Sequence, residues 1–259
     1  MSTSAPSQSE QAVRRVVAYI DGFNVYYGLQ NASRDSDKLW VKNGGRVEEC
    51  LGRSLYWLDL QKVIVDTLRP HEHCLKINYF SAPRKIPRRC RAQNEAELLE
   101  SNKRQMLYID ALRTLPLVEV TLGWYVEKTP HACPECGHRS PRWEEKATDV
   151  GIATAMLRDA FRDRFDLALL LSADADLVPP VEETRSLGKS VMLLLFPGRT
   201  RADRLKQCVD IVKEIRISDL RSCVMPPVVS REGLKPLVRP DRWDKPRGWV
   251  WGNEELPEL

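Results

Sequence analysis

Apolar residues along the chain fall into short runs that are separated by segments with helical spacing. A continuous or β-rich apolar run predicts a strand, because a parallel strand covered on both faces is apolar throughout. We expect strands over residues 14–20, 74–82, 117–125, 167–171 and 191–196, with a last short strand over EIRI at 214–217.

Helical patterns lie between these runs, and several have recognisable ends. Strands that alternate with helices of this length predict βαβ units, and therefore an α/β fold with a mostly parallel, doubly wound central sheet. The expected helices begin near Asn24, run from the cap Asp59 to Pro70, from Asn94 to about Leu112, over 149–161 with Thr148 as cap, from Pro179 and Pro180 to Gly188, and over 201–212.

Composition shifts predict one large domain with polar ends. A chain of 259 residues, 42% of them apolar, can bury a full core. We expect the folded domain over residues 13–220, with a cysteine-containing loop insertion at 127–146. Residues 1–12 are expected to be disordered, and residues 221–259 form a Pro-rich basic tail.

Composition also bears on compartment and partners. No apolar stretch approaches the roughly 18 residues that span a bilayer, and the polar start lacks the apolar core of a signal peptide, so we expect a cytoplasmic protein without a membrane partner. The chain has seven cysteines, an odd number, and five of them are scattered singly. This distribution indicates reduced thiols rather than a disulfide framework. The net charge of +4 is too small to indicate nucleic-acid binding by itself. A homo-oligomer stays open, because the tail and the cysteine loop could each make a subunit contact.

Acidic residues follow predicted strands at two places. Asp21 ends the run VVAYI, Asp174 and Asp176 follow LALLLS, and Asp149 opens a predicted helix. In a parallel sheet the carboxyl ends of the strands meet at one edge, so these carboxylates are expected to converge there. Unpaired carboxylates at close range repel one another, and such a cluster makes physical sense mainly around a divalent metal such as Mg²⁺.

Each acid also has a structural explanation. Asp21 with Gly22 could make a turn, Asp176 could cap the helix entered at Pro179, and Asp149 could favour the dipole of its own helix. Taken singly, each structural explanation carries as much weight as the functional one. Taken together, the positions favour a metal-activated water that attacks a phosphodiester.

Three segments carry a resemblance to a known family. The stretches YIDGFNVYYGL, KATDVGIATAML and LLLSADADLVPPVEETRSLGK resemble the signature segments of NYN domain proteins, in the LabA-like branch of the PIN-like nuclease superfamily. The segments WLDL and NYFSA are also similar to that branch, and the resemblance covers about residues 13–218. It implies a PIN-like (Rossmann-like) three-layer fold and a metal-dependent (endo)ribonuclease that uses Mg²⁺ or Mn²⁺.

The resemblance also implies roles for single residues. Asp21, Asp149, Asp174 and Asp176 match the family's catalytic, metal-binding acids, and Asn24 matches the amide of its first motif. The chain departs from the family pattern without losing a carboxylate. The departures are Ala173 and Ala175 at positions where small Gly-like residues are usual, Leu177 in place of an aromatic residue, and Thr148 before the second-motif acid.

Basic residues follow the second predicted strand in the loop PRKIPRRCR. We expect this loop at the same edge as the acids, where it would hold the phosphates of single-stranded RNA, although a solvated loop without a partner explains it equally well. Its candidate substrate-binding residues are Arg84, Lys85, Arg88, Arg89 and Arg91. In the tail, tryptophans such as Trp243 and Trp249 alternate with basic residues such as Arg242; they could stack on unpaired bases, but we favour packing on the domain itself.

The sequence CPECGH offers half of a zinc site. Cys133 and Cys136 can present two thiolates to one ion, but a closed structural Zn²⁺ site needs four ligands. A free thiol pair or a reversible disulfide accounts for this motif equally well. The residues that could complete the site are His131, His138, Cys50, Cys74 and Cys90.

The function predicted from the sequence is hydrolysis of RNA phosphodiester bonds by a metal-dependent ribonuclease. One alternative is a non-catalytic RNA-binding or regulatory module that keeps the fold. Another is a haloacid-dehalogenase-like phosphatase with Asp174 as nucleophile. The position of Asp174 disfavours the phosphatase. In haloacid-dehalogenase-like enzymes the strand that carries the nucleophile comes early in the chain, whereas Asp174 comes late.

Overall fold

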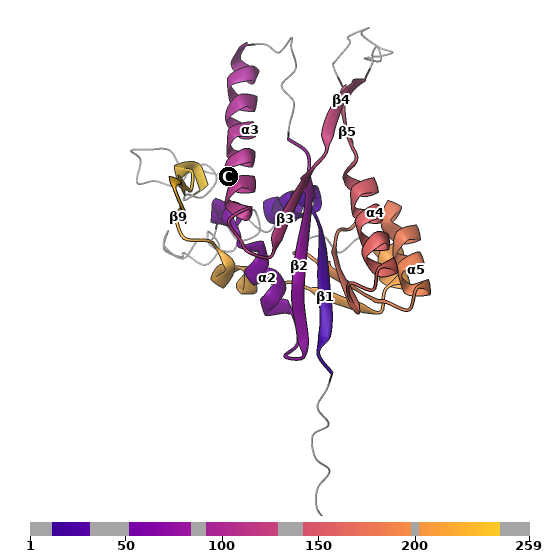
Figure 1. Cartoon of the computed structure of the whole chain (residues 1–259). Helices are drawn as coiled ribbons and strands as arrows, with labels where there is room; N and C mark the ends of the chain where they lie inside the picture. Colours follow the sequence, from indigo (N-terminus) through magenta and orange to yellow (C-terminus); the bar gives the residue numbers. More distant parts are fainter. Residues whose placement is uncertain (1–11, 32–51, 84–91, 129–141, 198–201, 244–259) are drawn as a thin grey trace, which may run out of the picture.

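The structure, a computed structural model, has a parallel six-stranded sheet at its centre (Figure 1). It describes residues 12–31, 52–83, 92–128, 142–197 and 202–243. The strand order is β3-β2-β1-β6-β7-β8, and each neighbouring pair is parallel, as the sequence predicts. The strands are β1 (Arg14–Asp21), β2 (Glu72–Ser81), β3 (Val118–Leu122), β6 (Leu167–Leu171), β7 (Ser190–Leu195) and β8 (Ile211–Glu214).

Helices cover both faces of the sheet and make the fold three-layered. In Figure 1, α2 and α3 lie on one side of the sheet and α4 and α5 on the other. None of the helices in the described ranges is long and apolar enough to cross a membrane. The main helices are the one over residues 22–31, α2 (Leu60–Thr67), α3 (Ala92–Leu112), α4 (Thr148–Phe161), α5 (Val178–Ser186) and α6 (Asp203–Cys208).

The alternation of side chains along β1 divides the core in two. Val16 and Ala18 are fully buried in the cluster that contains α2 and α3, whereas Val17 and Tyr19 belong to the cluster that contains α4 and α5. Because successive strand residues point to opposite faces, Asp21 follows Tyr19 onto the α4 side. The period-2 pattern of this strand therefore directs its terminal carboxylate toward the helix that carries Asp149.

The chain order of the strands changes direction next to β1. From β1 the chain builds outward through β2 to β3, then returns to the other side of β1 and builds outward through β6, β7 and β8. Adjacent loops at the carboxyl ends of β1 and β6 consequently diverge to opposite faces of the sheet. Such a switch point is where doubly wound folds bind ligands.

Gly123 divides the run expected as one strand over 117–125. Its N–H donates to the Ser81 carbonyl at 2.8 Å, and a Cβ at this position would lie 2.4 Å from the Lys146 carbonyl oxygen. After Gly123 the chain leaves the sheet as β4 (Trp124–Lys128), which pairs antiparallel with β5 (Arg142–Lys146). This hairpin, which the sequence did not predict, rises above the carboxyl edge of the sheet (Figure 1).

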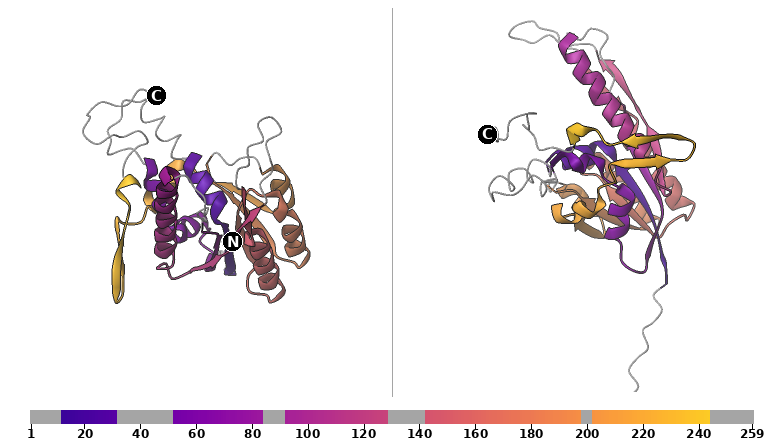
Figure 2. Two further views of the ribbon diagram at one scale, coloured as in Figure 1. Left: turned by 90° about the horizontal axis from the view of Figure 1, so that it is seen from above. Right: turned by 90° about the vertical axis from the view of Figure 1, so that its left-hand side faces the viewer.

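Two further expectations near the C-terminal part of the domain were wrong in detail. The last strand covers Ile211–Glu214 rather than EIRI, because its partners in β7 are Met192 to Leu195, and Ile217 already begins the short helix α7 (Ile217–Leu220). The helix expected over 201–212 is limited to α6. The tail contains an unpredicted hairpin of β9 (Val228–Arg231) and β10 (Leu234–Val238), which lies beside α3 (Figure 2).

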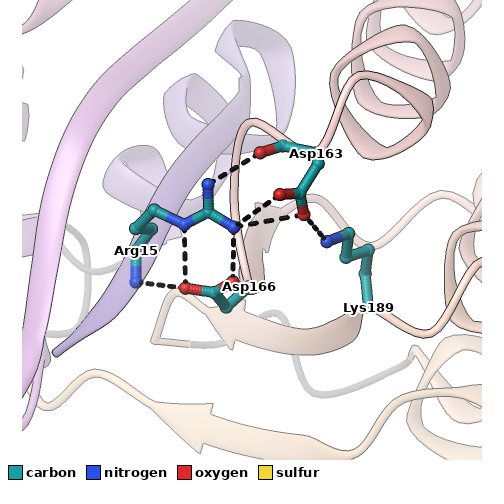
Figure 3. A network of polar contacts seen from close by, with 4 residues as sticks. All are labelled: Arg15, Asp163, Asp166 and Lys189. Atoms are coloured by element: carbon teal, nitrogen blue, oxygen red, sulfur yellow. Dashed lines mark hydrogen bonds and ion pairs between the residues drawn. The ribbon is translucent and has the colours of Figure 1, made fainter. Parts of the chain in front are cut away.

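An ion-pair network joins the amino ends of β1, β6 and β7 at the edge opposite Asp21 (Figure 3). The Arg15 guanidinium donates to Asp166 at 2.7 and 3.1 Å and to Asp163 at 3.1 and 3.2 Å, and Lys189 also pairs with Asp163. The hydrogen bonds from Arg15 lower the pKa of Asp166 to about 2. The network therefore fixes β1 against β6 at the end where the two strands start.

We predict that Arg15→Met lowers the melting temperature at pH 7 by about 2–4 °C, because the variant loses the ion pairs with Asp163 and Asp166. The Met side chain replaces the aliphatic part of Arg15 and should preserve its packing. A depressed carboxyl pKa stabilises the fold above the unfolded pKa near 4, and this contribution disappears as pH falls toward 2. The difference in melting temperature between wild type and variant, measured by circular dichroism, should therefore become smaller from pH 7 to pH 3. A difference in melting temperature that does not change with pH would show that the ion pairs do not contribute to stability.

Candidate active site at the carboxyl edge of the sheet

Asp21 is the buried centre of a hydrogen-bond network at the end of β1. The residue is 4% exposed. Its Oδ1 accepts from the Phe23 and Asn24 backbone N–H groups at 2.9 and 3.1 Å, so Asp21 caps the helix over residues 22–31. Its Oδ2 accepts from the Asn24 side-chain amide and from the Ser172 hydroxyl, the latter at 3.0 Å. Asp21 therefore has a structural role as a helix cap, and it also lines the cavity described below.

Ser172 is a site residue that the sequence analysis missed. It follows β6 directly and is 2% exposed. Besides donating to Asp21, its hydroxyl oxygen accepts from the Asn24 amide and the Asp174 N–H, each at 3.1 Å. The Asn24 side-chain oxygen in turn accepts from the Ala173 N–H at 3.2 Å. Asn24 and Ser172 thus join the ends of β1 and β6 and orient the acids that follow them.

Asp174 points into the site, whereas Asp176 does not line it. The Asp174 Oδ1 accepts from the Asp176 N–H at 3.0 Å, which makes Asp174 the cap of the short 3₁₀ turn Ala175–Leu177. The helix entered at Pro179 is therefore not capped by the Asp176 side chain. Asp176 is exposed and contributes its negative charge from the rim.

The first turn of α4 brings in a third acid, Asp149, and the hairpin brings in a fourth, Glu145. The cap of this helix is Ala147, with a positive φ of 80°, and not Thr148 as expected, because the Thr148 hydroxyl is engaged with the Glu145 carboxylate. Glu145 lies in β5 opposite Tyr125. No sequence motif identifies Glu145 as a site residue, because its position depends on the β4–β5 pairing.

Residues from the ends of β1, β5 and β6 and from the start of α4 line one cavity of about 360 Å³. Its wall contains four acids, and no Lys or Arg is among the described residues that line it. The acids are Asp21, Glu145, Asp149 and Asp174, and Asn24, Thr148, Phe23 and Tyr27 complete much of the wall.

Burial of the acids, together with their crowding, raises the pKa of two of them. Although Asp149 stays exposed on its open side, partial burial together with the charges of Asp174 and Asp21 raises its pKa to about 6. Burial, followed by the charges of Asp21 and Asp149, raises the pKa of Glu145 to about 7. The ionised site is thus destabilised by desolvation and by mutual repulsion, the two effects that a bound cation would offset.

The donor set fits a hard divalent cation in its chemistry. It consists of carboxylate and amide oxygens, the ligands that Mg²⁺ and Mn²⁺ prefer. No group of three or more His, Cys, Asp or Glu side chains in the described ranges is arranged to hold an ion directly. A cation here would therefore bind one or two carboxylates and complete its coordination with water, as Mg²⁺ usually does.

The other candidate ligands are not brought into this site. The basic residues Arg84, Lys85, Arg88, Arg89 and Arg91, and the pair Cys133 and Cys136, lie outside the described residues, so their roles stay predictions. Cys74 is described and lies near the start of β2, paired with Val16, at the edge opposite the β4–β5 hairpin. Burial raises the pKa of its thiol to about 11, so Cys74 is not a suitable partner for a zinc site in the hairpin loop.

Comparison with known proteins assigns the chain to a family. The family model described as NYN domain matches residues 15–215. The chain is 26% identical to 6-hydroxy-3-succinoylpyridine 3-monooxygenase HspA of Pseudomonas putida, over 88% of this chain and 75% of that protein. Among solved structures it is similar to a protein of unknown function from Vibrio parahaemolyticus, with a TM-score of 0.44 and 20% identity over 83% of this chain and 99% of the other. Since the family model spans most of its length, the chain belongs to the NYN domain family, a branch of the PIN-like nucleases.

Proposed function

We propose that the protein is a divalent-metal-dependent ribonuclease that hydrolyses phosphodiester bonds of single-stranded RNA. The observation that carries this proposal is the cavity at the switch point of the sheet, where four acids from separate chain segments meet without a cation to pair with among its described lining residues. Membership of the NYN family supports the nuclease over the phosphatase considered for Asp174.

The residues of the chain have separable roles in this reaction. Bound Mg²⁺ or Mn²⁺ would supply charge stabilisation of the phosphate and lower the pKa of the attacking water. One or two of Asp21, Asp149 and Asp174 are proposed to bind the ion directly and the remainder through its water ligands, with Asn24 and Ser172 positioning Asp21. Glu145, held by Thr148, is proposed as an additional acid that orients water in the cavity.

Two other functions remain to be separated from cleavage. A non-catalytic RNA-binding module would bind RNA with the same edge of the sheet but would not cut it. A second enzyme candidate is oxygenation of a pyridine ring, which is favoured by the similarity to the Pseudomonas putida monooxygenase. Incubation with 6-hydroxy-3-succinoylpyridine, dioxygen and a reductant, followed by chromatography, tests that candidate directly.

We predict that Asp149→Asn and Asp174→Asn each lower the rate of RNA cleavage by on the order of 100-fold, because each removes a negative charge that binds the ion. Asp176→Asn should have a smaller effect, since Asp176 does not line the cavity. The assay is cleavage of end-labelled RNA with Mn²⁺ or Mg²⁺. Undiminished cleavage in Asp149→Asn and Asp174→Asn would refute the proposed centre, and binding without cleavage by wild type would favour the module.

Glu145 has a matched control in its neighbour. Glu144 pairs with Lys128 and Lys146 at 2.8 and 2.6 Å and does not line the cavity. We expect Glu145→Gln to lower the cleavage rate by about tenfold or more, and Glu144→Gln to leave it within about twofold. Equal effects of the two substitutions would assign Glu145 a role in the hairpin rather than in the reaction.

Without metal, Asp149→Asn is predicted to raise the melting temperature at pH 8 by about 2–4 °C. The folded pKa of Asp149, about 6, lies above its unfolded value near 4, so ionisation opposes folding and the gain should vanish as pH falls to 4. Saturating Mn²⁺ should reverse the order, because wild type gains about 5–10 °C at a concentration near 100 Kd.

The control for this measurement is Glu183→Gln, which removes an exposed acid of α5 outside the cavity. It should change neither the metal-free melting temperature nor the response to Mn²⁺. If Asp149→Asn behaves like Glu183→Gln, Asp149 is not part of a metal site.

A further inference from the structure

A second and larger cavity, of about 610 Å³, lies next to the acidic one. The two share Phe23 and Tyr27, both from the helix over residues 22–31, so one helix forms a wall of each. The larger cavity opens to solvent and far exceeds the voids left by imperfect packing in a protein core. Its size falls within the range of binding pockets for small molecules and single nucleotides.

Aromatic side chains dominate the lining of this pocket. Tyr26 is 46% exposed and stacks on Tyr56, with ring centroids 5.7 Å apart and planes inclined by 26°. Tyr56 in turn contacts Trp243 at 5.9 Å, which lies 5.9 Å from Trp57. Trp243 is 9% exposed, so at this residue the tail packs on the domain, the interpretation we favoured.

The base of the pocket is held rigidly. The Tyr108 hydroxyl donates to the Leu58 carbonyl at 2.9 Å, and the Trp57 indole donates to the Pro226 carbonyl at 2.8 Å. The first bond fixes Tyr108, which lines the pocket. Trp57 is fully buried and does not line the pocket, but it is held in contact with Trp243, which does. A rigid wall of this kind favours planar ligands over flexible aliphatic ones, because little side-chain entropy is lost on binding.

Two arginines add positive charge to the aromatic wall. Arg104 comes from α3 and Arg242 from the turn Asp241–Trp243, and neither forms a salt bridge with another described residue. Partial burial, followed by the charge of Arg242, lowers the pKa of Arg104. Glu97 is the one acid among the described residues that line the pocket, and it is exposed. An anion between the arginines would relieve their repulsion, and a phosphate suits their planar donors.

We propose that this pocket binds one nucleotide of single-stranded RNA next to the scissile phosphate, with its unpaired base against Tyr26 and its phosphate at Arg104 and Arg242. The assignment rests on the proposed nuclease function. It follows from the combination of aromatic rings with two arginines that form no salt bridge to a described residue, and from Phe23 and Tyr27, which line both cavities and make them neighbours. In duplex RNA the base would be stacked on its neighbours and could not enter.

The test measures binding rather than cleavage, in the full-length chain with EDTA present. The probe is a fluorescein-labelled single-stranded RNA of about 12 nucleotides, followed by fluorescence anisotropy. We expect Tyr26→Leu and Arg104→Met each to raise Kd by about tenfold, in line with the loss of one base-stacking or phosphate contact.

Matched controls separate the pocket from general charge and hydrophobicity. Lys103 adjoins Arg104 on α3, pairs with Glu100 and does not line the pocket, so Lys103→Met should leave Kd within about twofold. Phe161 is 82% exposed on α4, so Phe161→Leu is the control for loss of an exposed ring. Circular dichroism must show unchanged folding in all four variants.

The outcomes distinguish this inference from the nuclease proposal. Tight RNA binding that depends on Tyr26 and Arg104 supports the pocket even if wild type never cleaves RNA, in which case only the nuclease proposal fails. The inference is overturned if the pocket variants bind like wild type, or if double-stranded RNA shows the same dependence on Tyr26. It is also overturned if RNA fails to bind while 6-hydroxy-3-succinoylpyridine binds in a manner that Tyr26→Leu abolishes.

Discussion

The parallel pairing of β1 with β6 is the constraint on which the site depends. Ile20 pairs with Leu171 at the end of the ladder, so Asp21 and Ser172 come next to each other as the two strands end. The hydrogen bond between them, at 3.0 Å, links positions 151 residues apart in the chain. Two apolar cores, one on each face of the sheet, hold the strands in this register. The acids are therefore brought together by the packing of apolar residues, against their mutual repulsion.

This origin explains why the site is electrostatically unfavourable in the free protein. Burial and neighbouring charges raise the pKa of both Asp149 and Glu145, and no arginine or lysine among the described lining residues compensates them. Functional sites commonly keep such unfavourable arrangements because the ligand relieves them. The contrast with Arg15 is informative, because at the other end of the same strands the acids are paired with cations and stabilise the fold.

The sequence predicts the parts of this arrangement that depend on local pattern. The apolar runs before Asp21 and before Asp174 identify two buried parallel strands, and the rule that ligands bind at carboxyl ends then brings their acids together. Glu145 could not be found in this way, because it reaches the cavity through the pairing of β5 with β4, two strands that are not adjacent in the sequence. Ser172 has no signal of its own, since a serine after a strand is common. The cap of α4 was assigned to Thr148 because a local rule favours threonine there, but the contact with Glu145 engages its hydroxyl.

The acidic cavity and the aromatic pocket are neighbours that share one helix. Phe23 and Tyr27 of this helix line both cavities, and Asp21, which lines the acidic cavity, caps the same helix. Anomalous diffraction from crystals grown with Mn²⁺ would show whether the carboxylates at the switch point bind a divalent cation. We expect an anomalous peak within the cavity lined by Asp21, Asp149 and Asp174. Well-ordered crystals without a peak there, or with Mn²⁺ bound only elsewhere, would contradict this expectation.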